Sequence, residues 1–207
     1  MLRRASMVVL MLSGLGLIVW AGIYNYHQRQ EQMEHARATH LTLSKDANGN
    51  GTITSDAPSD SLGRDLRGKA APAFKLKTLD GKSFSSADLK GHAVIINFWA
   101  TYCGPCKLEM PWFQEFSKKY EAQGLRVVGI DDEEGASHDD IATAVKKTGV
   151  TYPILIADSD IEKAFGLGDY LPSTYYVDAS GSVVVQTPGA PSKDEVEANI
   201  KKALGIQ

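Results

Sequence analysis

The chain has 207 residues, of which 43% are hydrophobic and 23% are charged, and its formal net charge at pH 7 is -3. A charge this small and this mixed does not indicate a nucleic-acid partner or an acidic tail. The length fits one medium-sized domain and an additional segment.

The additional segment is at the N-terminus, where Arg3 and Arg4 precede residues 5–24, a run without a charged side chain. As a helix, this run would rise by about 30 Å, which is enough to cross the hydrocarbon core of a bilayer. The sequence therefore predicts a transmembrane anchor at 5–24, with residues 1–4 in the cytoplasm and the rest of the chain on the extracytoplasmic side. A cleaved signal peptide, cut before Gly22, is the alternative, and the length of the run favours the anchor.

Residues 25–69 are expected to form a polar linker, because their second half is rich in Gly, Asn, Ser and Asp. Within this linker, residues 46–57 resemble the beginning of a calcium-binding EF-hand loop. The residues on matching loop positions are Asp46, Asn48, Asn50 and Gly51. Ala57 stands where the loop needs a bidentate Glu, so a flexible linker is preferred over a calcium site.

From Ala70 onward, extended runs alternate with helical patterns, which predicts an α/β layered domain with parallel strand pairs at its centre. A turn at Asp80-Gly81 joins the first two runs as a hairpin. Continuous apolar runs predict strands that are buried on both faces. The later strands are expected at 92–100, 125–131 and 152–158, before a hairpin that turns at Ser180-Gly181. The helices are expected at 105–123, 160–166, 192–204 and 137–149, the last with Ser137 as N-cap and Gly149 as C-cap.

The two cysteines of the chain, Cys103 and Cys106, stand in the stretch ATYCGPCKLEMPW. Cys103 follows a buried strand and opens a helix, so unpaired backbone N–H groups and the helix dipole favour its thiolate. We therefore expect Cys103 to be the nucleophile. Cys106 lies one turn further on the same side, where it can attack a mixed disulfide formed at Cys103. Pro105 suits the first helical turn, and Gly104 keeps access to Cys103 open.

Three other interpretations of the cysteine pair compete with a redox dithiol. A structural zinc site needs four ligands, and the sequence has neither a second C-x-x-C nor a close pair of histidines. A static disulfide that closes so small a loop confers little stabilisation. A peroxide-reducing cysteine does not need a partner two residues away. An exported domain lies in an oxidising compartment, where a dithiol is either a redox device or a structural bridge.

The stretch NFWATYCGPCKLEMP resembles the thioredoxin superfamily, and the resemblance extends from residue 70 to the C-terminus. The C-x-x-C-x-x-E-x-P pattern, the N-terminal anchor and the helix-strand unit at 137–158 resemble its TlpA/ResA-type branch of membrane-tethered thiol-disulfide oxidoreductases. The resemblance implies a thioredoxin-like fold for residues 70–207, in which helices flank a central mixed sheet. It also implies an N-terminal β-hairpin and a central helix-strand insertion in this domain, and a transmembrane helix before it.

The resemblance assigns catalytic roles to three residues. Cys103 attacks, Cys106 resolves, and Glu109 is a partly buried acid that exchanges protons with the dithiol, since an apolar pocket raises the pKa of a carboxyl group. A solvated position on the helix surface is the alternative for Glu109. Asn97 stands where thioredoxin has a buried Asp and cannot titrate, so proton transfer relies on Glu109, on water, or on both.

The resemblance also assigns a substrate-binding surface. DYLPSTYYVDASGSVV resembles the family's cis-proline segment, so Pro172 is expected to follow a cis peptide bond, with Leu171 offering backbone groups to a substrate. The other residues expected on this surface are Tyr102, Gly104 and Pro105. Tyr102 stands where thioredoxin has Trp.

These observations predict a disulfide reductase in the cell membrane whose catalytic domain faces the periplasm and needs no cofactor or metal. Its expected partners are a disulfide-bearing protein substrate and a membrane protein that donates electrons. The resemblance to the TlpA/ResA-type branch adds apocytochrome c to the candidate substrates. A peroxiredoxin-like peroxidase is one rival, although Thr101 is only two residues before Cys103 and that family has a T-x-x-C spacing. A copper-handling or other binding module is the second rival, with His92 as the histidine nearest to the core elements.

Overall fold

The computed structural model describes Trp20 and residues 41–45, 51–55 and 63–206. The chain divides into two compact units, Met1–Ala57 and Pro58–Gln207, which are described separately.

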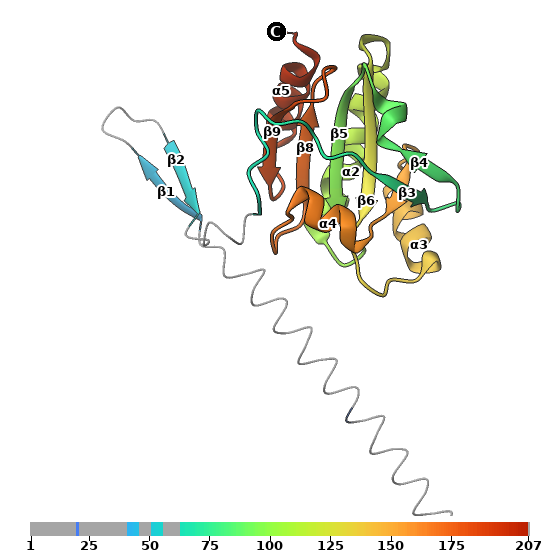
Figure 1. The fold of residues 1–207 in the computed structure, drawn as a ribbon. Helices are drawn as coiled ribbons and strands as arrows, with labels where there is room; N and C mark the ends of the chain where they lie inside the picture. Colours follow the sequence, from blue (N-terminus) through green and yellow to red (C-terminus); the bar gives the residue numbers. More distant parts are fainter. Residues whose placement is uncertain (1–19, 21–40, 46–50, 56–62, 207) are drawn as a thin grey trace, which may run out of the picture. The chain divides into compact units, whose positions relative to one another are not determined.

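In the first unit, strands β1 (Leu41–Lys45) and β2 (Gly51–Ser55) pair in antiparallel fashion as a two-stranded sheet (Figure 1). The segment expected to be only a polar linker therefore contains paired strands. Leu41, Leu43 and Ile53 alternate with polar residues, which is typical of a strand pair. The prediction of a linker rested on the turn-forming residues around them and did not use this alternation. Most of the calcium-loop-like stretch 46–57 lies outside the described residues.

The predicted membrane anchor at 5–24 also lies outside the described residues, except for Trp20, which is helical. Among the residues whose positions are described, no helix combines the length and the apolar character that a membrane span requires. The anchor stays a prediction of the sequence.

The second unit is built on a seven-stranded mixed sheet in the order β4-β3-β7-β6-β5-β8-β9 (Figure 1). Strands β5, β6 and β7 are parallel at its centre, while the remaining neighbours pair in antiparallel fashion. The strands are β3 (Lys75–Thr78), β4 (Ser83–Ser85), β5 (Ala93–Trp99), β6 (Leu125–Asp131), β7 (Ile154–Ile156), β8 (Ser173–Val177) and β9 (Val183–Pro188). The expected mixed sheet and N-terminal hairpin, β3–β4, are confirmed.

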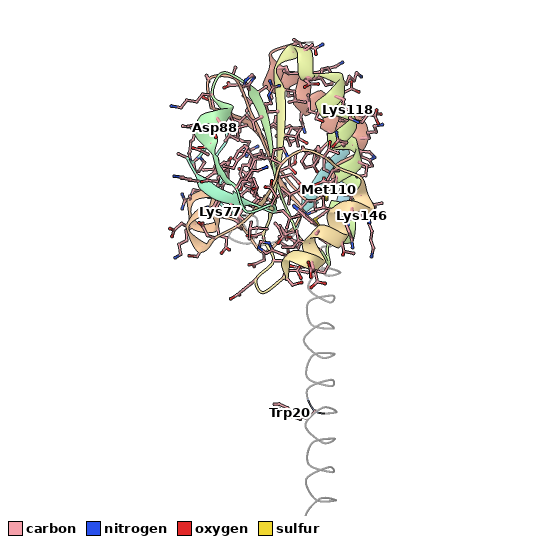
Figure 2. The ribbon with its side chains drawn as sticks, turned by 90° about the vertical axis from the view of Figure 1, so that its right-hand side faces the viewer. Trp20, Lys77, Asp88, Met110, Lys118 and Lys146 are labelled. Carbon is pink, nitrogen blue, oxygen red and sulfur yellow. A yellow bond between two sulfur atoms is a disulfide. The ribbon has the colours of Figure 1, made fainter. Side chains whose placement is uncertain are left out.

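Helices cover both faces of this sheet. The helices are α2 (Gly104–Lys119), α3 (His138–Thr148), α4 (Ser159–Phe165) and α5 (Lys193–Leu204), with short 3-10 turns η2 (Ser86–Leu89) and η3 (Glu121–Gln123). Apolar residues of α2, α3 and α5 share one core cluster, and those of α4 belong to a second cluster on the opposite face. In Figure 2, the Met110 side chain of α2 lies inside the domain, whereas Lys118 and Lys146 lie at its periphery.

The predicted caps of α3 are confirmed. The Ser137 hydroxyl accepts the N–H of Asp140 at 3.1 Å, and Gly149 ends the helix in the left-handed region with φ of 71°. Other boundaries differ from the prediction. Helix α2 ends at Lys119, four residues early, and β7 is shorter than expected because Pro153 precedes its first ladder residue.

The second unit's folded domain begins before the predicted boundary at residue 70. Leu66 is 4% exposed and belongs to the core cluster beside α4. The Arg64 N–H donates to the Gly166 carbonyl at 2.7 Å. Gly63 has φ of +78°, and a Cβ there would lie 2.5 Å from the Gly166 carbonyl oxygen, so only glycine fits. Residues 63–69 are thus part of the domain, although their polar composition suggested a linker.

Candidate active site

Cys103 and Cys106 form a disulfide at the start of α2. Cys103 is the N-cap residue, and its Sγ accepts the Cys106 backbone N–H at 3.2 Å. Cys103 is 7% exposed, whereas Cys106 is completely buried. The sulfur that a substrate can reach is therefore that of Cys103, and the unpaired N–H groups of the first turn are available to stabilise its thiolate.

The loop that presents the disulfide is held by its own backbone and by two side chains. Strand β5 is buried along its whole length, and the Cys103 N–H donates to the Ala100 carbonyl at 3.1 Å just after it. The Thr101 N–H and hydroxyl both donate to Glu133 Oε2, at 2.8 and 2.5 Å. Lys107 Nζ donates to the Thr101 carbonyl at 2.9 Å. This strand-to-helix junction fixes the position of Cys103.

Glu109 lies one turn after Cys106 on the buried face of α2 and is completely inaccessible. The surface position that the sequence left open as an alternative is excluded, and burial is more complete than the resemblance implied. Loss of hydration raises the pKa of Glu109 from 4.5 to about 8, although a hydrogen bond from Asn97 opposes this rise. Glu109 is therefore an acid that titrates close to neutral pH, as a proton donor and acceptor should.

Asn97 and Thr174 complete this buried polar group. Asn97 Nδ2 donates to Glu109 Oε1 at 2.7 Å and to Thr174 Oγ1 at 2.9 Å. Glu109 Oε2 and Asn97 Oδ1 have no hydrogen-bond partner among the described residues. Sequence reasoning identified Asn97 only as a group that cannot titrate and missed Thr174. The available signal was that both residues are polar positions within strands that are buried along their whole length.

The Leu171–Pro172 peptide bond is cis, the isomer that the resemblance implied. Pro172 is buried and Leu171 half-buried. The Pro172 carbonyl accepts the Gly189 N–H at 2.7 Å. No hydrogen bond joins the Leu171 backbone to another residue in the part of the chain that the structure describes. Its backbone groups are therefore available to an added partner.

The outer surface beside the disulfide contains the other predicted substrate-binding residues. Tyr102, Gly104 and Pro105 are exposed, Tyr102 to 65%. A Cβ added at Gly104 would meet no atom within 4 Å, so the approach beside Cys103 is open. Leu108, which the sequence analysis did not single out, is 68% exposed on the solvent side of the same helix.

A run of acids follows β6 at the same edge of the sheet, because Asp131 pairs in register with Trp99 of β5. Burial and the charge of Glu133 raise the pKa of Asp131 to about 7. Burial, with the charge of Glu162, raises the pKa of Asp132 to about 7 as well. Sequence reasoning missed these acids. Their place at the carboxyl end of a strand parallel to β5 was the signal, since carboxyl ends of parallel strands meet at one edge.

No cluster of three or more His, Cys, Asp or Glu side chains in residues 63–206 or the other described positions is arranged to hold a metal ion. The reactive groups that the structure brings together are the disulfide, the buried Glu109 and the cis-proline strand. A thioredoxin-like fold with a disulfide at the start of a helix after a central strand defines a thiol-disulfide oxidoreductase.

Comparison with known proteins identifies the family. Residues 67–186 match the AhpC/TSA family. Thiol-disulfide oxidoreductase ResA of Bacillus thuringiensis (strain Al Hakam) is 37% identical over 138 residues, which cover 65% of this chain and 77% of that protein. Thioredoxin-like protein YneN of Bacillus subtilis (strain 168) is 37% identical over 134 residues, covering 64% of this chain and 78% of that protein.

A solved structure agrees with these relatives. The crystal structure of a thiol:disulfide interchange protein, a thioredoxin family protein from Chlorobium tepidum TLS, matches with a TM-score of 0.61 and 36% identity over 69% of this chain and 100% of that one. The protein therefore belongs to the AhpC/TSA family of thioredoxin fold and is an enzyme of the ResA type, a thiol-disulfide oxidoreductase.

Proposed function

We propose that this enzyme is a reductant of protein disulfides that is anchored in the cell membrane with its catalytic domain on the extracytoplasmic side. The observation that carries the thiol-disulfide exchange chemistry is the arrangement around the sulfurs: Cys103 is reachable, Cys106 is sealed, and the buried acid Glu109 lies one turn behind them. A dithiol of this kind can attack a substrate and close on itself without exposing its second thiol.

Charge near the site supports the reducing direction. A strongly oxidising dithiol owes its potential to a stabilised reduced form. Here the acids at the end of β6 lie close enough to Tyr102, the neighbour of Cys103, to raise the pKa of its hydroxyl group, after the larger effect of burial. Negative charge disfavours a thiolate. In our proposal these acids oppose the stabilisation of a Cys103 thiolate by the helix N-terminus, and this opposition favours a lower potential.

The catalytic cycle follows from the two sulfurs. The Cys103 thiolate attacks one sulfur of a substrate disulfide, so a mixed disulfide forms and the other substrate sulfur leaves as a thiolate. The Cys106 thiol then loses its proton and attacks Cys103 Sγ. The Cys103–Cys106 bond forms, the second substrate thiolate is released, and two electrons have passed to the substrate. Glu109, one turn from Cys106, accepts that proton when it is ionised and returns one when it is neutral.

A trapping experiment tests this order of attack. A Cys106→Ser variant is expected to accumulate mixed disulfides through Cys103, because the resolving thiol is missing, and a Cys103→Ser variant is expected to accumulate none. Non-reducing electrophoresis followed by mass spectrometry identifies the trapped partner. Adducts that form equally on Cys103→Ser would contradict the assignment. Robust peroxide consumption by Cys106→Ala would instead favour a thiol peroxidase.

The location and the partners rest on the sequence. Residues 5–24 lack a charged side chain and follow Arg3 and Arg4, which supports an anchor with the domain outside. An extracytoplasmic reductant needs electrons from a membrane protein, because that compartment has no reducing thiol pool. Apocytochrome c, whose cysteines must be reduced before haem attachment, is the substrate that the resemblance suggests. The full chain is expected to resist extraction from membranes at alkaline pH, and deletion of residues 1–24 is expected to remove this resistance. Extraction of the full chain would contradict the anchor.

A further inference from the structure

Asn97 occupies the centre of a buried polar row on the α2 face of the sheet. It pairs in register with Thr174 of β8, and paired residues of neighbouring strands have side chains on the same face. The helix above this face contributes Glu109. Both hydrogens of Asn97 Nδ2 are used, one toward Glu109 Oε1 at 2.7 Å and one toward Thr174 Oγ1 at 2.9 Å. All three residues are completely buried.

This arrangement makes the two oxygens of the Glu109 carboxyl group unequal. Oε1 accepts a hydrogen bond from Asn97, so a proton on Oε1 would compete with that donor. Oε2 has no hydrogen-bond partner among the described residues. We infer that Asn97 is a positioning residue that holds Oε1 as a fixed acceptor and leaves Oε2 as the atom that takes up and releases the proton. The inference rests on the proposed proton-transfer role of Glu109.

The same amide group connects the acid to the substrate side of the site. Thr174 lies in β8, two residues after the cis Pro172, and the Pro172 carbonyl is itself held by the Gly189 N–H at 2.7 Å. Asn97 therefore fixes Glu109 to the strand that follows the cis-proline as well as to β5. A fixed acid is what efficient proton transfer requires, since a displacement on the order of 1 Å is costly in rate.

The orientation of the amide matters most for the ionised acid. Asn97 Nδ2 faces Glu109 Oε1 and Thr174 Oγ1, whereas a reversed amide would place Oδ1 against Oε1, and an ionised carboxylate offers no hydrogen to that oxygen. A donor toward Glu109 favours the ionised acid, in agreement with the lowering effect of Asn97 on the Glu109 pKa. Replacing the donor must therefore make the acid harder to ionise, which a purely structural residue would not do.

The test compares Asn97→Leu, Thr174→Val and Glu109→Gln with the parent enzyme. The carboxyl carbon of Glu109 is followed by NMR as a function of pH, and the rate of disulfide exchange with a model disulfide is measured over the same range. Asn97→Leu is expected to move the Glu109 midpoint upward by about one pH unit or more, the size expected for one hydrogen bond to a charged group. Thr174→Val keeps Asn97 as the hydrogen-bond donor to Glu109 but removes the second partner of its amide group. This variant is expected to raise the Glu109 midpoint by a smaller amount.

The Glu109→Gln background separates the inference from the proposed function. If Glu109→Gln leaves the pH dependence of exchange unchanged, the proton-transfer role of Glu109 is wrong. If Glu109→Gln changes it but Asn97→Leu titrates like the parent, the positioning role of Asn97 is wrong. Adding Asn97→Leu to Glu109→Gln is expected to cause no further pH shift. Near-ultraviolet circular dichroism checks the fold of each variant. If Asn97→Leu does not fold, the Glu109 midpoint is measured in the single variants Asn97→Ala and Thr174→Val instead.

Discussion

The two faces of the central sheet are buried equally well but are built differently. On the α4 face, the rings of Phe98, Phe165 and Tyr175 meet edge to face, with centroids 4.9 to 5.8 Å apart. On the α2 face, the carboxyl group of Glu109, the amide of Asn97 and the hydroxyl of Thr174 are completely buried in the same half of the domain as the disulfide. Both faces bury apolar side chains that stabilise the fold, and the α2 face also accepts buried polar groups that cost stability.

Strand β5 supplies both faces, because alternate side chains of a strand point in opposite directions. Phe98 belongs to the aromatic face, while its neighbours Asn97 and Trp99 lie on the α2 side. Neighbouring residues in one sequence therefore serve different purposes. Substitutions on the aromatic face should change the free energy of unfolding alone, whereas those of the buried polar groups on the α2 face should also change redox and proton chemistry.

The largest expected effect is on the disulfide itself. Cys103→Ser should abolish reduction of protein disulfides, because the remaining Cys106 is buried and cannot reach a substrate. The far-ultraviolet spectrum should not change. The measurement is reduction of insulin with dithiothreitol as the electron source, compared with the uncatalysed rate. Activity that survives in Cys103→Ser would break the division of roles between the two sulfurs.

On the aromatic face, Phe98→Ala should lower the free energy of unfolding by about 3 to 5 kcal/mol, since a completely buried ring is replaced by a cavity. Urea denaturation measures this loss. The redox potential and the pH dependence of exchange should match the parent, because Phe98 faces away from the site. A shift of the potential in this variant would show that the two faces are not separable.

On the α2 face, Glu109→Gln should change how stability depends on pH. The folded-state pKa of Glu109 is raised from 4.5 to about 8. Between these values the unfolded chain has lost the proton and the folded chain keeps it, so this group makes stability fall as pH rises from 4.5 to about 8. Below pH 4.5 the group has no such effect. At pH 7 the cost is about 3 kcal/mol as an order of magnitude.

The measurement is urea denaturation of the parent and of Glu109→Gln between pH 4 and pH 8. The variant should lose less stability over this range, and the difference between the two curves isolates Glu109, since Asp131 and Asp132 contribute the same fall to both. Parallel curves would contradict a neutral, buried Glu109 at pH 7.

The smallest expected effect is at Ser137, which belongs neither to the aromatic cluster nor to the buried polar group. Ser137→Ala removes the hydroxyl that caps α3 and should cost about 1 kcal/mol. Thermal unfolding gives the loss, and exchange kinetics should be unaffected. Ser137→Asp is the matched control, because it retains a capping oxygen and should unfold near the parent temperature.

Sequence reasoning succeeded where one local signal decides the structure. The strand expected at 125–131 matches β6 to the residue, and Ser137 and Gly149 bound α3 as expected. It failed where a residue depends on distant parts of the chain. Leu66 sits in a polar stretch, and only the core beside α4, formed by residues about a hundred positions later, makes it buried.

The same contrast between local and distant signals applies to the prediction of the site. Cys103, Cys106 and Glu109 belong to one local stretch, and their spacing placed them together. Thr174 and Asp131 come from other strands, and their proximity depends on the register of β5 with β8 and β6. That register is set by the whole sheet and cannot be read from a run of residues.

The reduction potential of the Cys103–Cys106 pair tests the central claim most directly. The oxidised protein is equilibrated with defined ratios of reduced and oxidised glutathione, or of dithiothreitol where glutathione is too weak, and the two forms are separated after alkylation. A protein reductant should give a potential at or below about -270 mV, the value of thioredoxin. A potential near about -120 mV, that of a strong oxidant, would contradict the proposed direction of electron flow.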